Sequence, residues 1–471
     1  MPRSCCARRQ FLKTSAGAVG VALGAAASLK CSPAAAESRE DLDQVWDVVV
    51  CGGGPAGIMA AWAAALEGAT CLLVERQPIL GGMATSGLVG PISKFRFDGR
   101  LMVEGLPWRF VSLLQSRQGA VLDLPSGNVP FEADAYATAA QEVLTQAGVR
   151  VLLDTELAEA ACGEQNRIVS IVVRRQGQQQ TLRARVFVDA TGMGNLICRT
   201  PLAAPLRAPA DELQPMSLIF RLEDVDTEAL VVWMAQDRTR YSQPQLREAL
   251  QKAAADKRIA LFGGPWAVFG STIRPGSVSV NATRFAGSAT DPAVLAQAKA
   301  TMSANIPVMI DVFRQAHPAF KKCRLRDVAA VVGVRESRGA VGEYCLSSED
   351  VRAGRIFADA VALGGHPLDM HRAKDASQEA PFLDRPYSIP YRCLVPQGSQ
   401  NLLVAGGLIS ADRQAFSSAR VQAQCMATGQ AAGTAAALCV SAGIVCAKLD
   451  PRRLRERLQA QGAVLAPPQK T

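Results

Sequence analysis

The chain has few aromatic side chains and very few histidines. Aromatic residues make up 5% of its 471 residues, and its three histidines are His317, His366 and His371. The 13 cysteines show no C-x-x-C pair or other spacing typical of a metal site or a redox dithiol. We therefore predict no metal site and no disulfide framework, and general-base candidates are few.

Acidic side chains are absent from residues 1–36, which carry five positive charges. Arg8-Arg9 is followed by the small, apolar stretch Ala16 to Leu29 and by the A-x-A pattern of residues 34–36. This order predicts a twin-arginine signal peptide over residues 1–36, recognised by the twin-arginine translocase and directing the folded protein to the periplasm. A membrane anchor would need about 20 apolar residues, and Lys30 disfavours lipoprotein processing at Cys31.

Long hydrophobic runs are also missing from the remainder, whose formal charge falls from +9 to +4 once residues 1–36 are removed. This charge does not indicate a nucleic-acid partner. The most apolar helical pattern, 421–443, contains Gln422, Gln424 and Gln430. We predict a helix buried in the protein and no stable membrane span in the mature chain.

What the sequence does contain is an alternation of strand and helix patterns. A β-branched run, Asp47 to Cys51, is followed by glycines, by the Ala-rich segment 58–67 and by a second strand pattern, 70–74. This predicts a βαβ unit and an α/β fold. Further patterns predict a helix at 131–148, strands at 149–153, 167–174, 181–188 and 401–405, and the helix at 421–443.

The pattern changes between residues 201 and 324, where strands at 216–222 and 277–283 and helices at 242–254 and 291–315 are expected. We interpret this region as an inserted α+β substrate domain. The predicted boundaries are 1–36 for the signal, 45–200 and 325–450 for two parts of a Rossmann-like domain with a central parallel sheet, 201–324 for the insertion and 451–471 for a basic C-terminal tail.

A glycine-rich motif, GGGPAG, occupies residues 52–57 between the first strand and the first helix. In the G-x-G-x-x-G pattern, Gly52 makes the turn, Gly54 admits a pyrophosphate and Gly57 allows helix and strand to pack closely. Glu75, 18 residues beyond Gly57, is placed to accept hydrogen bonds from a ribose diol. An acid at this position favours FAD or NAD over NADP.

Further motifs follow in a specific order: LGGMATSGLVGP, VDATG, VGVRESR, IPYRCL, NLLVAG and VQAQCMATGQAAGTAAAL. With GGGPAG, they resemble the bacterial FAD-dependent oxidoreductase family of the glutathione-reductase-like superfamily. The resemblance implies FAD as the cofactor, with Gly81, Gly82 and Met83 near the pyrophosphate and ribityl chain. It also places Gly192 at the adenosine side and Gly406-Gly407 at the ribityl group. The complete set of predicted cofactor-binding residues is Gly52, Gly54, Pro55, Ala56, Gly57, Glu75, Arg76, Gly81, Gly82, Met83, Thr85, Gly192, Gly406 and Gly407.

Catalytic candidates come from the segment 364–392, which we expect to reach the flavin face. We predict that Arg392 holds an anionic or carbonyl group, with Tyr391 beside it, and that His366 or His371 takes the proton. His317 is expected to be solvated beside a basic run. Two alternatives remain open elsewhere: Arg335, Glu336 and Arg338 either steer an anionic substrate or form a buried ion-pair network, and Cys393 either packs as a thiol or holds a covalent flavin.

Together these observations predict an exported FAD-dependent dehydrogenase or oxidase in which a small-molecule substrate gives hydride to flavin N5. A quinone, a redox carrier or oxygen would then accept the electrons. One alternative is a periplasmic flavin reductase of the fumarate-reductase kind. The other is a non-catalytic exported FAD-binding protein, because the loop of residues 408–418 lacks the histidines that many members of the family carry there.

Overall fold

The computed structural model describes residues 42–467 except 123, 125, 238–242, 269–271 and 376. The predicted signal peptide, residues 1–36, lies outside the described part. The described residues from Val45 onward form one compact unit.

The larger sheet has seven strands in the order β5-β2-β1-β8-β7-β6, with β17 also paired to β8. Its parallel part contains β1 (Val45–Cys51), β2 (Cys71–Val74), β5 (Arg150–Leu152), β8 (Gln178–Asp189) and β17 (Leu402–Val404). The antiparallel strands β6 (Thr155–Cys162) and β7 (Ile168–Arg175) extend it through β8. Val48, Val49 and Val50 are fully buried, as expected of a parallel strand covered on both faces. The predicted α/β class with a central parallel sheet is confirmed.

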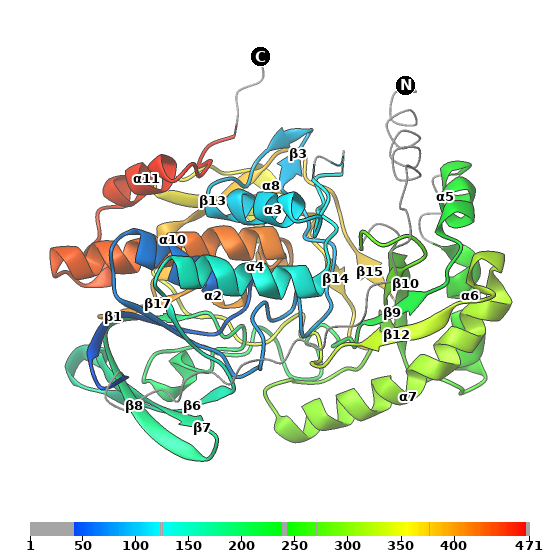
Figure 1. Cartoon of the computed structure of the whole chain (residues 1–471), viewed down its shortest axis with the longest axis horizontal. Helices are drawn as coiled ribbons and strands as arrows, with labels where there is room; N and C mark the ends of the chain where they lie inside the picture. The colour runs from blue at the N-terminus through cyan, green and yellow to red at the C-terminus, as the bar shows by residue number, and fades with distance from the viewer. Residues whose placement is uncertain are drawn as a thin grey trace, which may run out of the picture. The chain divides into compact units, whose positions relative to one another are not determined.

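Two helices from opposite ends of the chain pack against each other over this sheet (Figure 1). They are α2 (Pro55–Leu66) and α10 (Gln422–Ala442). A Cβ on Gly429 would lie 2.1 Å from the carbonyl oxygen of Ala56, and one on Gly433 would lie 2.0 Å from that of Ala60. Residues four apart share one face of a helix, so these glycines form the stripe along which α10 approaches α2. The buried-helix interpretation of 421–443 follows from this contact.

Further helices cover the same core. They are α3 (Leu106–Ser116), α4 (Ala133–Gln146), α8 (Ser348–Ala353), α9 (Arg413–Ala419) and α11 (Pro451–Ala460). Helix α11 lies within the segment that the sequence suggested as a basic tail. Its Leu454 and Leu458 are buried, and Asp450 caps its N-terminus. Residues 451–460 are therefore part of the folded core.

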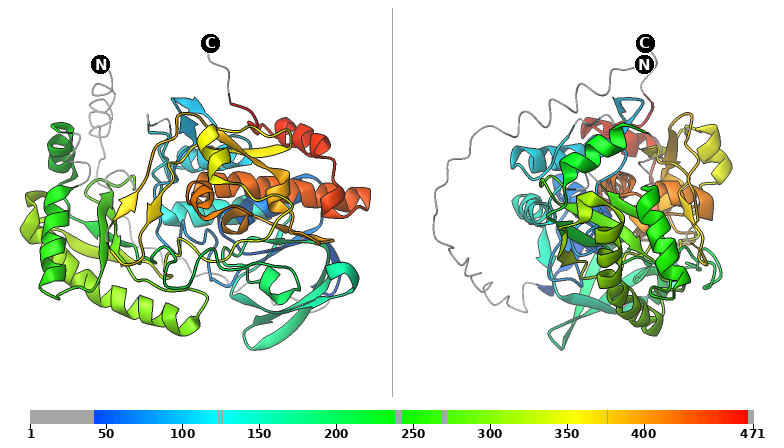
Figure 2. Two further views of the ribbon diagram at one scale, coloured as in Figure 1. Left: turned by 180° about the vertical axis from the view of Figure 1, so that it is seen from behind. Right: turned by 90° about the vertical axis from the view of Figure 1, so that its right-hand side faces the viewer.

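A second, antiparallel sheet has the strand order β10-β11-β9-β12. Its strands are β9 (Phe220–Glu223), β10 (Phe262–Val268), β11 (Val278–Thr283) and β12 (Arg324–Val328), and its helices are α5 (Thr227–Ala235), α6 (Pro244–Ala255) and α7 (Pro292–Ala316). Figures 1 and 2 show these green elements grouped together, apart from the parallel sheet. Their buried side chains form a hydrophobic cluster of their own, drawn from residues 216–332.

The strand expected at 216–222 begins later, at Phe220. Met216 and Ser217 instead form single bridges to Phe285 and Gly333. Short strand pairs complete the unit: β3 (Arg96–Phe97) with β4 (Arg100–Leu101), β13 (Ala360–Gly364) with β16 (Tyr387–Pro390), and β14 (Met370–His371) with β15 (Gln378–Glu379). Among the described residues, no helix has both the length and the apolar character needed to cross a membrane.

Candidate flavin site

The glycine-rich turn links β1 to α2, and each position requires glycine for a different structural reason. Gly52 has a φ of +105°, a conformation that L side chains rarely adopt. A Cβ on Gly57 would lie 1.7 Å from the carbonyl oxygen of Gly52. At Gly54, in contrast, an added Cβ would meet no atom within 4 Å. Gly54 therefore borders open space at the N-terminus of α2, where backbone N–H groups and the helix dipole favour an anion.

Glu75 follows β2 and is held in a fixed position. Its side chain is buried, Oε2 accepts a hydrogen bond from the Gly53 backbone N–H at 2.5 Å, and Oε1 accepts one from Gln77 N–H at 2.8 Å. This carboxylate belongs to the wall of the same cavity as Gly54. The predicted spacing therefore brings the acid to the glycine-rich turn.

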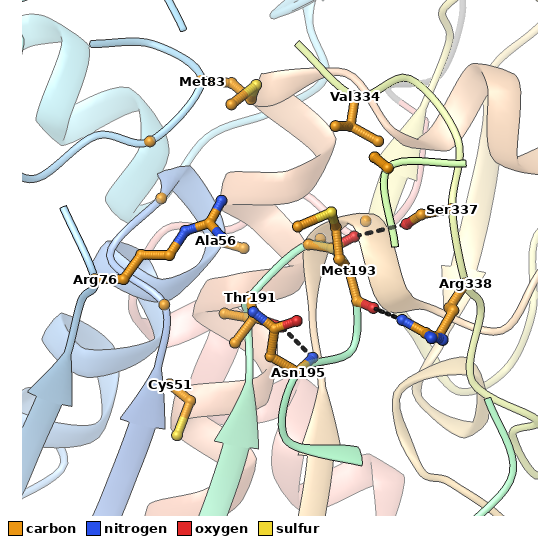
Figure 3. A pocket seen from close by; sticks show the side chains of 18 of the residues that line it. Cys51, Ala56, Arg76, Met83, Thr191, Met193, Asn195, Val334, Ser337 and Arg338 are labelled. Atoms are coloured by element: carbon orange, nitrogen blue, oxygen red, sulfur yellow. Dashed lines mark hydrogen bonds between the residues drawn. The ribbon is translucent and has the colours of Figure 1, made fainter. Parts of the chain in front are cut away.

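The cavity encloses about 660 Å³, and most of the predicted cofactor-binding residues line it. Figure 3 shows part of this wall, with Arg76 extending past Ala56 and Met83 on the adjacent loop. The predicted residues in the wall are Gly52, Gly54, Pro55, Ala56, Glu75, Arg76, Gly82, Met83, Gly192, Gly406 and Gly407.

Three predicted residues, Gly57, Gly81 and Thr85, support the wall from behind. The Gly81 N–H donates to the Gly53 carbonyl at 2.8 Å, and the Thr85 hydroxyl donates to the Leu80 carbonyl at 2.7 Å. A Cβ on Gly81 would lie 2.4 Å from Thr85 Cγ2. These residues shape the second glycine turn, and Gly57 packs the helix against the strand.

Asp189, at the end of β8, is a site residue that we did not single out from the sequence. It is fully buried, and its carboxylate accepts hydrogen bonds from the backbone N–H groups of Thr191, Leu196 and Ile197 and from the Thr191 hydroxyl. It thereby holds the loop of residues 190–195, most of which lines the cavity. The aspartate of VDATG, at the end of an apolar strand pattern, was the available signal.

The segment VGVRESR reaches the same cavity, with different roles for its charged residues. Arg335, Glu336 and Arg338 all line the wall. Glu336 Oε1 accepts from Arg413 Nε at 2.9 Å, so this part of the motif forms an ion pair. Arg335 instead donates to the Pro215 carbonyl, the Ser217 hydroxyl and the Asn281 side-chain oxygen, all neutral acceptors. Figure 3 shows Ser337 and Arg338 bonded to the 190–195 loop.

Tyr391 and Arg392 lie away from the cavity wall. The Tyr391 hydroxyl is buried and donates to the Cys446 carbonyl at 3.0 Å. Arg392 pairs with Asp359 at 2.9 Å and stacks over the Tyr344 ring. The short 3₁₀ helix Tyr391–Leu394 directs these side chains to other partners. The structure therefore does not bring these two candidates to the predicted flavin face.

Neither histidine candidate lines the cavity; His371 is buried and His366 is half-buried. Ser418 donates to the His366 carbonyl, and the His366 ring lies 2.9 Å from the Pro367 carbonyl. His371 Nε2 lies 3.3 Å from Asp369, whose Oδ2 also contacts Arg420 at 3.3 Å. Burial lowers the pKa of His371 to about 3. Since Arg420 lines the cavity, His371 is two contacts away from it.

Two remaining expectations concern residues outside the site. His317 is not solvated: its side chain is buried against Trp233 and Phe320, and its Nδ1 accepts from the Ala319 N–H at 3.1 Å. The basic residues next to it in sequence misled that prediction. Cys393 is fully buried, and burial raises the pKa of its thiol, which favours the packed thiol over a covalent flavin link.

The βαβ turn, the buried acid after β2 and the cavity between them define a dinucleotide-binding protein of the Rossmann-like class. The profile of the FAD dependent oxidoreductase family matches residues 47–458. The chain therefore belongs to this family and is an FAD-dependent oxidoreductase.

Curated relatives match part of the chain. Digeranylgeranylglycerophospholipid reductase 2 from Methanopyrus kandleri is 26% identical over 170 residues, covering 35% of this chain and 42% of the reductase. Thiamine thiazole synthase from Aeropyrum pernix is 30% identical over 202 residues, covering 39% of this chain and 67% of the synthase. The chain thus spans less than half the length of the reductase.

Among solved structures, a geranylgeranyl bacteriochlorophyll reductase-like protein from Thermoplasma acidophilum aligns with 88% of this chain and 83% of its own length. Its TM-score is 0.43 and its sequence identity is 14%.

Proposed function

We propose that the protein is an exported dehydrogenase or oxidase that removes a hydride and a proton from a small-molecule substrate. The observation that carries this proposal is the single cavity that joins the glycine-rich turn and Glu75 to a wall containing Arg335 and Arg420. One part of this cavity has the features of a dinucleotide site. Another part carries positive side chains that the G-x-G-x-x-G motif does not require.

The residues of the wall fit FAD. Added Cβ atoms at Gly54 and Gly192 would meet no atom within 4 Å, so the backbone there leaves room for a ligand. Gly54 and the N-terminus of α2 would hold the pyrophosphate, Glu75 the ribose diol, and Gly406 and Gly407 the ribityl chain. When bound, FAD supplies a two-electron acceptor for the hydride.

The proposed substrate end of the cavity is lined by Leu295, Val331 and Val334 beside Arg335 and Arg420. Apolar side chains there would exclude water, and the guanidinium groups would orient a polar substrate group.

None of the four catalytic candidates lines the cavity, and we propose His371 as a positioning residue, since Asp369 connects it to Arg420. Burial lowers its pKa to about 3, so at neutral pH its imidazole is too weakly basic to take the substrate proton.

The direction of electron flow has one competing proposal. One relative named above is a reductase, and a wall containing arginines also suits an unsaturated acid that receives electrons. In the oxidative direction, a quinone, a carrier protein or oxygen would take the electrons. Dye-coupled assays run in both directions separate the two proposals.

The experiment for the function is anaerobic bleaching of the purified yellow holoprotein by a panel of metabolites. We expect at least one metabolite to bleach the visible absorbance of the oxidised flavin. Gly54→Val, which puts a branched side chain on the pyrophosphate path, should purify colourless, while Gly163→Ala in the β6-β7 hairpin should stay yellow. A bound flavin that neither a metabolite nor a reduced dye can reduce would favour the non-catalytic alternative.

A further inference from the structure

A pair of arginines shares neutral partners beside the flavin cavity. Ser217 Oγ accepts from Arg284 Nη1 at 2.7 Å and from Arg335 Nη1 at 2.6 Å. Asn281 Oδ1 accepts from Arg284 Nη1 at 2.8 Å and from Arg335 Nη2 at 2.9 Å. Two guanidinium groups bonded to the same two oxygens lie close together. Among the described residues, no carboxylate forms an ion pair with either of them.

A third arginine, Arg420, adjoins this pair. It donates to the Arg335 carbonyl at 2.7 Å and to Gln214 Oε1 at 3.2 Å, and it pairs with Asp369 at 3.3 Å. Its side chain is 11% exposed. The cluster of Arg284, Arg335 and Arg420 therefore carries three positive charges against the one negative charge of Asp369.

Part of this surplus of charge lies where water has little access. Arg284 is buried, and its Nη2 has no hydrogen-bond partner. Burial, followed by the charges of Arg284 and Arg420, lowers the pKa of Arg335. A guanidinium nonetheless stays protonated in proteins, so the cluster keeps its charge. Buried charges are normally paired, and an anionic partner from outside the chain would satisfy this requirement.

The unused donors limit the kind of anion. At the cavity wall, Nη2 of Arg335 has one partner, whereas the unpartnered Nη2 of Arg284 does not line the wall. A carboxylate has two oxygens to satisfy and a phosphate or sulfate has more, so the few unused donors at the wall suit a carboxylate better. Arg335 and Arg420 also belong to the cavity wall that contains the glycine-rich turn. A group bound there would be part of the substrate of the flavin site.

We infer that the substrate carries a carboxylate group, which Arg335 and Arg420 bind at the cavity wall while Arg284, behind them, adds positive charge. This inference rests on the proposed function. It names the substrate class of the same site, a small carboxylic acid, and assigns Arg284 as a positioning residue that acts through Arg335.

The test compares isosteric probes on the FAD-loaded protein by calorimetry and by the change in flavin absorbance. Propionate and benzoate are the charged probes, with propionamide and benzamide as their neutral counterparts and inorganic phosphate as the third arm. We expect saturable binding of a carboxylate, at least 10-fold tighter than its amide. No preference for the carboxylate, or tighter binding of phosphate, overturns the inference.

Variants locate the binding. Arg335→Gln and Arg284→Gln should each weaken carboxylate binding at least 10-fold and leave amide binding unchanged, and Arg335→Lys should retain part of it. Arg324→Gln, which removes the same charge from an exposed position on β12, should bind as the unaltered protein does. Carboxylate binding that survives in both glutamine variants overturns the assignment.

Flavin content separates this inference from the proposed function. FAD-loaded protein that metabolites reduce but that ignores carboxylates contradicts the inference alone, whereas protein that never binds FAD contradicts the proposed function. If Arg335→Gln loses the cofactor, Arg284→Gln decides, because Arg284 does not line the cavity.

Discussion

The most direct test of the cofactor site at the scale of single residues is Glu75. Its carboxylate holds the Gly53 and Gln77 N–H groups and faces the cavity. Glu75→Ala removes these acceptors and the partner of the ribose diol, a loss of about 1–3 kcal/mol. We expect the Kd for FAD to rise roughly 5- to 150-fold. Glu164→Ala, on the surface of the β6-β7 hairpin, is the control, and an unchanged Kd in Glu75→Ala would refute the ribose assignment.

His371 should make stability depend on pH. Burial lowers its folded-state pKa to about 3, below the ordinary 6.5 of an unfolded histidine. The unfolded chain therefore binds a proton below pH 6.5 that the folded protein refuses, and stability falls as the pH drops from 6.5 towards 3. Between pH 7 and pH 5 this single group should remove about 1–2 kcal/mol from the free energy of unfolding.

Urea denaturation at pH 7 and pH 5 measures this loss for the FAD-loaded protein and for His371→Gln. The variant should lose less stability between the two pH values than the unaltered protein. The other histidines contribute in the same direction, since burial also lowers the pKa values of His366 and His317. An equal loss in the variant would show that His371 titrates normally.

Sequence predicted single residues best where the backbone itself is constrained. Gly52 and Gly57 have the steric roles that the motif implies. Side-chain interactions were harder to predict from the sequence, because they join distant segments. Glu336 pairs with Arg413, 77 residues later, and Arg335 bonds to Ser217, 118 residues earlier. The even choice between substrate steering and an ion-pair network could not be resolved from the motif. In the structure, Glu336 forms an ion pair, whereas Arg335 donates to neutral acceptors and lines the cavity.

At the scale of elements, the close crossing of α2 and α10 yields a stability prediction. A leucine at Gly433 would force its Cβ to within 2.0 Å of the Ala60 carbonyl oxygen. The helices must separate, and overpacking of this kind typically costs about 1–3 kcal/mol or more. We expect Gly433→Leu to lower the unfolding temperature and to weaken FAD retention. Ser441→Leu, at the exposed end of α10, should change neither, and a stable Gly433→Leu would contradict this packing.

Long elements were predictable because their patterns are strong. The helix expected at 421–443 is found at Gln422–Ala442, and the strand expected at 167–174 is found at Ile168–Arg175. Two-residue strands such as Met370–His371 exist through pairing with a distant partner and have no local pattern. Helix α11 did have a signal, the cap Asp450 before Pro451 with Leu454 and Leu458 four apart, which its basic side chains obscured.

At the scale of the whole molecule, the prediction concerns export. Arg8 and Arg9 are the pair that we propose the twin-arginine translocase reads, and that pathway carries folded cargo with its cofactor. Changing both to lysine should leave yellow, reducible protein in the cytoplasm. Cell fractionation with measurement of flavin content tests this, with Lys13→Arg as the control that should export normally. Normal export of the double variant would refute the signal.

Gly429 and Gly433 of α10 contact Ala56 and Ala60 of α2, so two segments that are synthesised at different times must pack together. The glycine-rich turn leaves the ribosome early, but the helix that packs against it is among the last parts to be made. Gly406 and Gly407, which complete the cavity wall, are equally late. A nascent chain that still lacks α10 contains the glycine-rich motif but not the complete cavity wall. We therefore expect FAD to bind only after α10 has been synthesised.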